Sequence, residues 1–184
     1  MTKGVQNVEP IRSLEKIEDM KWALKRHCSE RDYILFLLGI NVGLRVSDML
    51  QLKAKEVKGK KKIIIREGKT QKPRTVHLQN IYDELNDYIK GLDSEWLFPS
   101  RKGDKPITRI QAYRQLNRAA EMADIEEGIG THTMRKTFGY WYYKQTKDIA
   151  KLQEILNHSH PNITKRYIGI TAEEIEDSLA GFKL

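Results

Sequence analysis

Polar residues of particular types stand where helices of this chain are expected to begin or end. Arg45 directly follows a Gly-Leu helix stop, and His132 and Arg135 lie one helical turn apart on a common face. The His132 and Arg135 side chains, placed in this way, can bind one anion together. Toward the C-terminus, His158 stands at another expected helix end, and Tyr167 follows it by nine residues. An anion-binding site is therefore the first chemistry that these residues suggest.

Each of these residues also has a simple structural explanation. Arg45 stands three residues before Asp48, a spacing typical of an ion pair on a helix. A histidine in the first turn of a helix is commonly a cap or a surface residue, and a tyrosine, one of eight here, is commonly part of the core. Taken singly, the residues do not decide between these explanations and a functional site.

Motifs of metal and nucleotide sites are missing from the sequence. It contains no Walker-type phosphate loop, no Gly-x-Gly-x-x-Gly and no His-Glu-x-x-His. His158 and His160 form a tight histidine pair, but on their own they are a weak zinc signal. We therefore expect no metal and no cofactor.

The composition describes a basic globular chain of one-domain size. Its 184 residues are 39% hydrophobic and 32% charged, with a net charge of +8 at pH 7 and a mean hydropathy of −0.63. No apolar run approaches the roughly 20 residues that cross a bilayer, and the first residues lack the apolar stretch of a signal peptide. The single Cys28 excludes an internal disulfide. We expect a cytoplasmic protein without a membrane partner, whose charge is compatible with nucleic acid but does not require it.

Apolar spacing predicts a chain made mainly of helices. Residues 13–27 repeat apolar side chains every three or four positions after Ser13, a capping residue type, and the apolar run 33–38 continues to a stop at Gly43. A short helix is predicted for residues 45–52. Further helical patterns cover residues 80–89, 108–122 and most of the chain after 130.

One segment changes to the pattern of strands. Ile63–Ile65 and Thr75–Leu78 are rich in β-branched residues and enclose a turn-like segment, which predicts a β-hairpin with Lys69 and Lys72 at its tip. The expected fold class is therefore mainly α with a small antiparallel β-sheet (α+β), in one domain over residues 1–184.

Four short motifs gain meaning from their order along the chain. They are Gly43-Leu44-Arg45, His132-x-x-Arg135, Leu156-x-His158 and Tyr167. In this order they resemble the catalytic domain of the tyrosine recombinase (phage integrase) family, and the likeness extends from about Ser13 to the C-terminus. The resemblance implies the fold of that catalytic domain.

The resemblance also implies a role for each residue. Tyr167 is expected to attack the scissile phosphate and form a 3′-phosphotyrosine, while Arg45 and Arg135 clamp the phosphate oxygens. His132 would accept or relay the proton of the tyrosine, and His158 would donate a hydrogen bond to the phosphate. These types suit metal-free phosphodiester cleavage, which needs a nucleophile, cations and an acid.

The remaining roles are carried by residues near these five. Lys69 is expected to protonate the departing 5′-oxygen, with Lys72 as its rival for this role. Asp48 would orient the guanidinium of Arg45, although a plain ion pair explains it equally simply. The residues expected to contact DNA are Lys72, Arg74 and Lys136.

The chain departs from the family pattern at two positions and at its beginning. Asn157 replaces the usual glycine before the histidine, and Lys136 replaces the histidine that often follows the second arginine. Asparagine tolerates a left-handed backbone, so we expect the turn at 157 to form. Residues 1–12 are expected to be a flexible lead-in, with the family's N-terminal core-binding domain absent.

The segment 170–184 has the pattern of a terminal amphipathic helix that begins with a capping box. Its apolar face could pack on its own domain or, as the resemblance implies, on a neighbouring protomer. The implied assembly is a homotetramer on two sites in double-stranded DNA, weakly associating or monomeric without DNA.

The function implied by the resemblance is site-specific DNA recombination without metal or ATP, in a bacterial or phage-encoded protein of a mobile element. Two alternatives stay open. One is DNA relaxation of the type IB topoisomerase kind, and the other is a catalytically silent DNA-binding module with the same fold.

Overall fold

The computed structural model describes residues 8–125, 129–170, 179–180 and 182–183. Its helices are α1 (Leu14–His27), α2 (Glu30–Val42), α3 (Val46–Met49), α4 (Ala54–Val57), η1 (Gln79–Ile81), α5 (Tyr82–Lys90), α6 (Arg109–Met122), α7 (Thr133–Thr146), α8 (Ile149–Ile155) and α9 (Pro161–Ile168). Strands β1 (Lys62–Arg66) and β2 (Pro73–His77) pair in antiparallel fashion, with Ile64 opposite Thr75. The expected fold class is confirmed. Within the described part of the chain, no helix is both long and apolar enough to span a bilayer.

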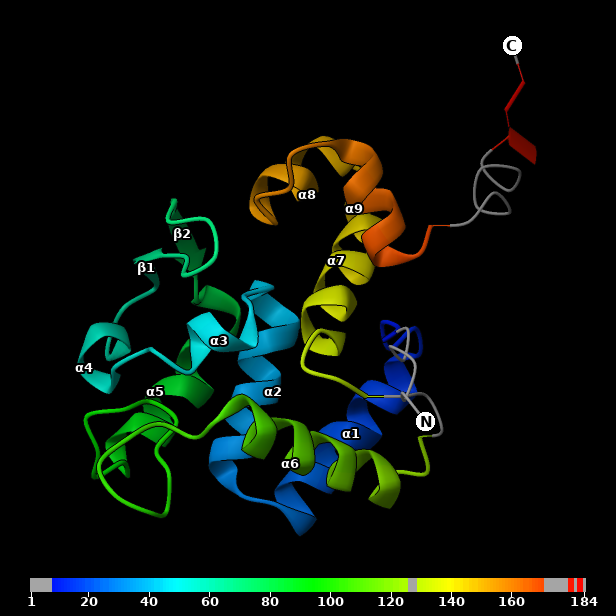
Figure 1. Ribbon diagram of the computed structural model, residues 1–184. Coiled ribbons are helices and arrows are strands. Elements are labelled where there is room, and N and C mark those ends of the chain that lie inside the picture. Colours follow the sequence, from blue (N-terminus) through cyan, green and yellow to red (C-terminus); the bar gives the residue numbers. More distant parts are fainter. Residues whose placement is uncertain (1–7, 126–128, 171–178, 181, 184) are drawn as a thin grey trace, which may run out of the picture.

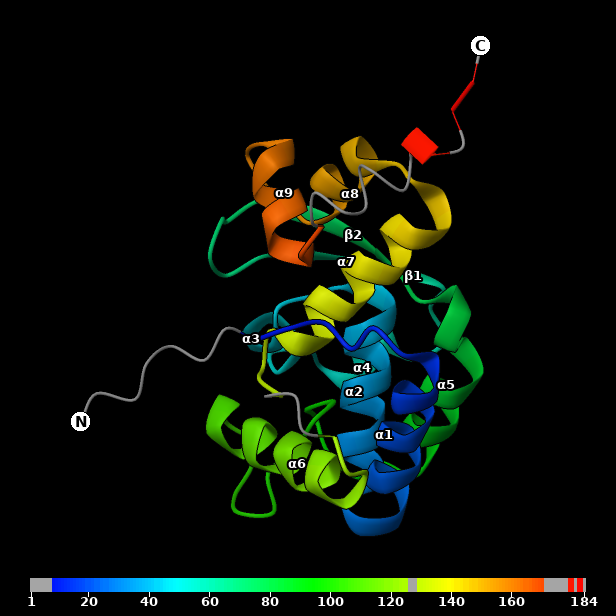
Figure 2. The ribbon, with the colours of Figure 1, turned by 90° about the vertical axis from the view of Figure 1, so that its right-hand side faces the viewer.

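Helix α2 is the centre of the larger core. It packs against α1, α5, α6 and α7, as Figures 1 and 2 show. Its side chains include Phe36 and Leu38, which are fully buried. The cap expected at Ser13 is present, because the Ser13 hydroxyl accepts a hydrogen bond from a backbone amide in the first turn of α1. Ser29 caps the first turn of α2 in the same way. The apolar run 33–38 therefore lies in the centre of the larger core, where other helices pack against α2.

Helices α7, α8 and α9 form a second group beside the β-hairpin (Figure 2). Helices α8 and α9 pack on each other and on α7, with Leu152, Leu156 and Ile168 fully buried between them. The functional candidates lie where this group meets the hairpin and the end of α2.

Residues 8–12, the described part of the expected lead-in, are packed onto α7. The backbone amide of Ile11 donates to the Thr137 hydroxyl at 2.9 Å, and the Trp141 indole donates to the Ile11 carbonyl at 2.9 Å. These hydrogen bonds and the buried Ile11 side chain hold this part of the expected lead-in against α7, and residues 1–7 lie outside the described residues. The expected terminal helix lies largely in residues 171–178, outside the described residues.

Gly43 ends α2 in the left-handed conformation, with φ of +60°. A Cβ atom there would also collide with the ring of Phe138. Gly43→Ala is therefore expected to lower the free energy of unfolding by about 2–4 kcal/mol, from backbone strain plus overpacking. Gly59→Ala is the matched control, because Gly59 has φ of +70° and open space around it. Equal losses in urea unfolding of the two variants would contradict the predicted contact with Phe138.

Candidate active site

Arg135, in the first turn of α7, ties two helix ends together. Its side chain is 2% exposed, and its guanidinium donates to the carbonyls of Gly43 and Leu156, each at 2.5 Å. These carbonyls stand at the ends of α2 and α8. Burial lowers the pKa of Arg135 to about 10, so the group stays charged at neutral pH. The structure therefore holds a fixed cation where the two helix groups meet.

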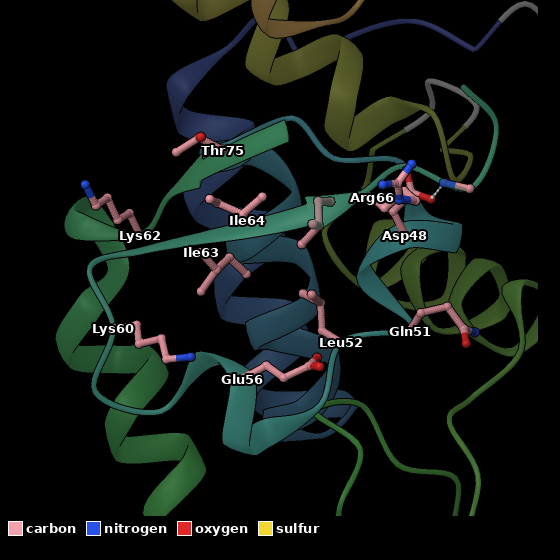
Figure 3. Close-up of a pocket in the computed structure, with 12 residues that line it drawn as sticks. Asp48, Gln51, Leu52, Glu56, Lys60, Lys62, Ile63, Ile64, Arg66 and Thr75 are labelled. Atoms are coloured by element: carbon pink, nitrogen blue, oxygen red, sulfur yellow. Dashed lines mark hydrogen bonds between the residues drawn. The ribbon is translucent and has the colours of Figure 1, made fainter. Parts of the chain in front are cut away.

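Arg45 precedes α3, and its guanidinium lies near the same carboxylate as that of Arg135, the carboxylate of Glu67. Its Nη1 atom lies 2.9 Å from the Glu67 carboxylate and 3.9 Å from that of Asp48. Asp48 in turn accepts a hydrogen bond from the backbone amide of Gly68 at 3.1 Å, which is the dashed line beside it in Figure 3. Asp48 thus touches both Arg45 and the hairpin turn, as a residue that orients Arg45 would.

Glu67 is a central residue of the site that the sequence analysis missed. Its carboxylate is fully buried and accepts hydrogen bonds from the Thr70 hydroxyl at 2.9 Å and the Asn157 amide at 3.0 Å. Burial alone would raise the pKa of Glu67, but the ion pair with Arg45 and the hydrogen bonds from Thr70 and Asn157 outweigh it and lower the pKa to about 2. The group is therefore a permanent anion among the arginines. One signal could have found it, because Ile63, Ile65 and Glu67 continue the inward-facing alternation of β1.

Arg74 departs from its expected role as a DNA contact. It is 9% exposed and lies opposite Ile65 in the hairpin, on the inner face. Its guanidinium donates to the carbonyls of Val42 at 2.6 Å and Gly43 at 3.2 Å, and lies 3.4 Å from Glu67. The sequence analysis expects Arg74 to contact DNA, whereas in the structure its guanidinium is buried against the end of α2. Its side chain instead fastens the hairpin to the end of α2.

The Tyr167 hydroxyl lies 3.3 Å from Nδ1 of His132, the N-cap residue that directly precedes α7. Burial raises the pKa of Tyr167, against the smaller opposing effects of Arg135 and Arg45. The pKa of His132 is lowered by burial and by nearby cations, of which Arg109 has the largest effect. A protonated phenol thus stands beside a neutral imidazole, which is the arrangement in which a histidine can accept the phenol proton.

His158 and Lys136 both pack on the ring of Tyr167. The His158 ring meets it edge to face at 5.1 Å between centroids, and the Lys136 ammonium lies 5.4 Å from the ring centroid. Nδ1 of His158 lies 3.0 Å from the Thr164 hydroxyl. Asn157, which precedes His158, has φ of +55°, so the turn forms with asparagine in place of glycine, as predicted.

The two hairpin lysines remain at the edge of this arrangement. Lys69 and Lys72 are exposed in the turn between the strands. Among the described residues, no hydrogen bond or ion pair joins either lysine side chain to the arginines, the histidines or Tyr167. Contacts of Glu67 and Asp48 hold the turn beside the site. They do not favour Lys69 over Lys72 as the expected acid.

Figure 3 shows a hollow between β1 and α4, whose lining contains neither Arg135 nor Tyr167. Its lining includes Leu52, Glu56 and Ile63, together with Asp48 from the site. In the described ranges, no three His, Cys, Asp or Glu side chains come close enough to hold a metal ion.

The unusual pKa of His158 leads to a prediction. Burial, with Arg135 and Arg45 nearby, lowers this pKa from 6.5 to about 4. The unfolded chain therefore binds more protons than the folded one between these values, and the free energy of unfolding should rise with pH across that window. An NMR titration of the DNA-free protein should show His158 titrating near 4. His158→Gln should flatten the stability slope above about pH 4.5, and an unchanged slope would contradict the burial effect.

Comparison with known proteins identifies relatives over nearly the whole chain. The sequence model of the phage integrase family matches residues 14–174. The probable integrase/recombinase YoeC of Bacillus subtilis (strain 168) is 53% identical over 165 residues, covering 89% of this chain and 90% of that protein. The tyrosine recombinase XerA of Thermococcus kodakarensis is 32% identical over 162 residues, covering 84% of this chain and 56% of that protein.

Solved structures agree with this result at the level of the fold. The XerH site-specific recombinase, in a post-cleavage complex with palindromic difH substrate, matches with a TM-score of 0.72 and 23% identity. The match covers 94% of this chain and 53% of that one. The chain therefore spans most of the Bacillus relative but about half of these larger recombinases. The resemblance inferred from the motifs is confirmed.

Proposed function

The chain belongs to the phage integrase family of DNA strand-transferring enzymes, and we propose that it is a site-specific recombinase acting through a 3′-phosphotyrosine. The carrying observation is the convergence of Tyr167 and His132 with two buried or half-buried arginines, Arg45 and Arg135. These residues come from three separate segments of the chain: the start of α3, the start of α7 and α9. Their meeting at one point supports a phosphodiester as the substrate.

The geometry supports the following cleavage step. The Tyr167 oxygen attacks phosphorus and passes its proton to Nδ1 of His132, 3.3 Å away. Arg45 and Arg135 stabilise the charge on the non-bridging oxygens, and His158 donates a hydrogen bond to one of them. The bond to the 5′-oxygen breaks, and that oxygen takes a proton from Lys69. A 5′-hydroxyl from a second strand reverses the step, so the phosphoester bond energy is kept and no ATP is needed.

Because arginines supply the positive charge, the proposal includes activity without a divalent metal. The test is incubation of the protein with supercoiled plasmid in EDTA, stopped with detergent, followed by detection of protein attached to DNA. A covalent adduct at a 3′-phosphate supports the proposal. Gel retardation of DNA carrying a cognate site without any adduct would overturn it in favour of a silent binding module. Relaxation without strand exchange between two sites would favour activity of the type IB topoisomerase kind.

Double-stranded DNA is the proposed partner, with a homotetramer on two sites as the active assembly. XerH, which has the same fold, was solved bound to its palindromic difH substrate, and this supports the first part of the proposal. The residues 170–184 are proposed to link neighbouring protomers. Analytical ultracentrifugation of the protein alone and with DNA that carries two sites measures the number of protomers in the complex. Four protomers only in the presence of DNA would support the assembly, and a DNA complex with one protomer would contradict it.

Lys72 and Lys136 are proposed to contact DNA phosphates other than the scissile one. Replacing either by glutamine should weaken binding to any duplex and reduce the slope of log affinity against log salt by about 0.9, the loss of one counterion-releasing contact. Fluorescence anisotropy at several salt concentrations measures this slope. Lys90→Gln is the control, because Lys90 pairs with Asp87 on the exposed face of α5. A slope that is the same in all three variants would remove both lysines from the interface.

A further inference from the structure

The Glu67 carboxylate joins the hairpin turn to residues of three other segments. Its Oε2 atom faces Arg45 Nη1 at 2.9 Å and accepts the Asn157 amide at 3.0 Å. Its Oε1 atom lies 3.4 Å from Arg74 and 4.0 Å from Arg135. The cleavage step derived above does not use this carboxylate. A buried charge with this many partners needs another explanation.

The buried arginines do not depend on Glu67 alone. Arg135 and Arg74 each donate to two backbone carbonyls, so their guanidinium groups stay fixed if the carboxylate is neutralised. Arg45 also lies within ion-pair distance of Asp48. Glu67 therefore adds little to the placement of the two deeply buried cations.

The hairpin turn depends on Glu67 much more strongly. Residues 67–72 are tied to the rest of the domain by the Glu67 side chain and by the Gly68 amide bound to Asp48. Glu67 also holds the turn internally through the Thr70 hydroxyl. Lys69 is exposed between these two residues. Whatever fixes Glu67 and Thr70 thus fixes the backbone from which Lys69 projects.

We propose that Glu67 is a positioning residue that anchors the lysine-bearing turn, residues 67–72, to Arg45 and to Asn157. Asn157 is its partner in the turn between α8 and α9, so the asparagine supplies a contact that a glycine would not. This inference rests on the proposed function insofar as Lys69 is the acid of the cleavage step. Loss of the Glu67 carboxylate should therefore impair protonation of the departing 5′-oxygen. The arginines that bind the phosphate should stay in place.

The test compares Glu67→Gln on two DNA substrates that differ in one atom. In the first, the scissile phosphate carries the normal 5′-oxygen; in the second, a bridging 5′-sulfur replaces it. A thiol has a pKa of about 8.5, so a thiolate leaves without needing a proton. Glu67→Gln should slow cleavage of the oxygen substrate by about 30- to 100-fold, because a misplaced acid loses part of the roughly 10²–10⁴-fold that a positioned acid supplies. On the sulfur substrate, the variant should cleave within about tenfold of the rate of the parent on the same substrate.

Reference variants define each outcome. Lys69→Ala should show the same recovery on sulfur, whereas Arg135→Lys should remain slow on both substrates. Glu56→Gln removes an exposed carboxylate from α4 and should cleave at the parent rate. Asn157→Gly keeps the left-handed turn and deletes the contact to Glu67, so it should show a smaller defect with the same recovery. An equal defect of Glu67→Gln on both substrates would overturn the proposal.

A second measurement needs no activity. In the DNA-free protein, Glu67→Gln should speed amide hydrogen exchange in residues 67–72 by about tenfold while α7 exchanges as in the parent. Faster exchange confined to the turn supports the anchor even if the parent forms no adduct, which would count against the proposed function alone. Unchanged exchange in the turn, or faster exchange throughout the domain, would overturn the anchor.

Discussion

Replacing Tyr167 by phenylalanine is expected to abolish the covalent protein–DNA adduct and to lower strand cleavage by at least about 10⁴, because the substitution removes the attacking atom itself. The change deletes the hydroxyl that lies 3.3 Å from His132. It keeps the ring that packs on His158 and under Lys136. DNA affinity should change by less than about fivefold, since one hydrogen bond contributes about 1 kcal/mol.

The measurement is denaturing electrophoresis of labelled DNA after incubation in EDTA, with anisotropy for affinity. Tyr143→Phe is the matched control, because Tyr143 packs in the same small core with Leu152, Leu156 and Ile168. Tyr143→Phe should form the adduct as the parent does. An adduct that persists in Tyr167→Phe would move the nucleophile to another residue.

The sequence predicts the candidate site as far as local patterns reach. Arg45, His132 and Arg135 occupy helix ends, and helix ends are set by residues within one turn, such as Gly43. Their order identifies the family, so the convergence of distant segments could be expected from the resemblance. The structure then places the Tyr167 hydroxyl beside His132, as that expectation requires.

The roles of Glu67 and Arg74 could not be assigned in the same way, although the alternation of β1 points the Glu67 side chain inward. Both lie in a segment dense in lysine and arginine, where the common expectation is a solvated loop. Their burial depends on the packing of the hairpin against the ends of α2 and α8, which is a property of the tertiary fold. A buried glutamate is stable only when several donors surround it, and here those donors are Arg45, Thr70 and Asn157.

The fold shows the same division. Capping serines and apolar spacing predict α1 and α2 closely, because both act within a few residues. The packing of residues 8–12 on α7 rests on hydrogen bonds across more than 120 positions of the chain, and no local pattern reports such contacts.

Arg135→Lys is expected to lower single-turnover cleavage by about 10²–10³, the usual cost of removing one preorganised donor from a transition-state anion. Lysine keeps the charge but cannot donate to the Gly43 and Leu156 carbonyls and to a phosphate at the same time. Leaving a buried carbonyl unpaired should also lower the free energy of unfolding by about 1–3 kcal/mol. Cleavage must therefore be compared at a temperature where urea unfolding shows the variant to be folded.

Arg74→Lys separates the loss of stability from the loss of catalysis. Arg74 is also a buried arginine that donates to two backbone carbonyls, one of which is the same Gly43 carbonyl. The two variants should therefore lose similar stability, about 1–3 kcal/mol each. Arg74 fastens the hairpin and has no assigned place on the phosphate, so Arg74→Lys should slow cleavage by less than about tenfold, far below the effect of removing a transition-state donor. If both variants slow cleavage equally, Arg135 serves the fold alone, and the phosphate clamp would rest on Arg45.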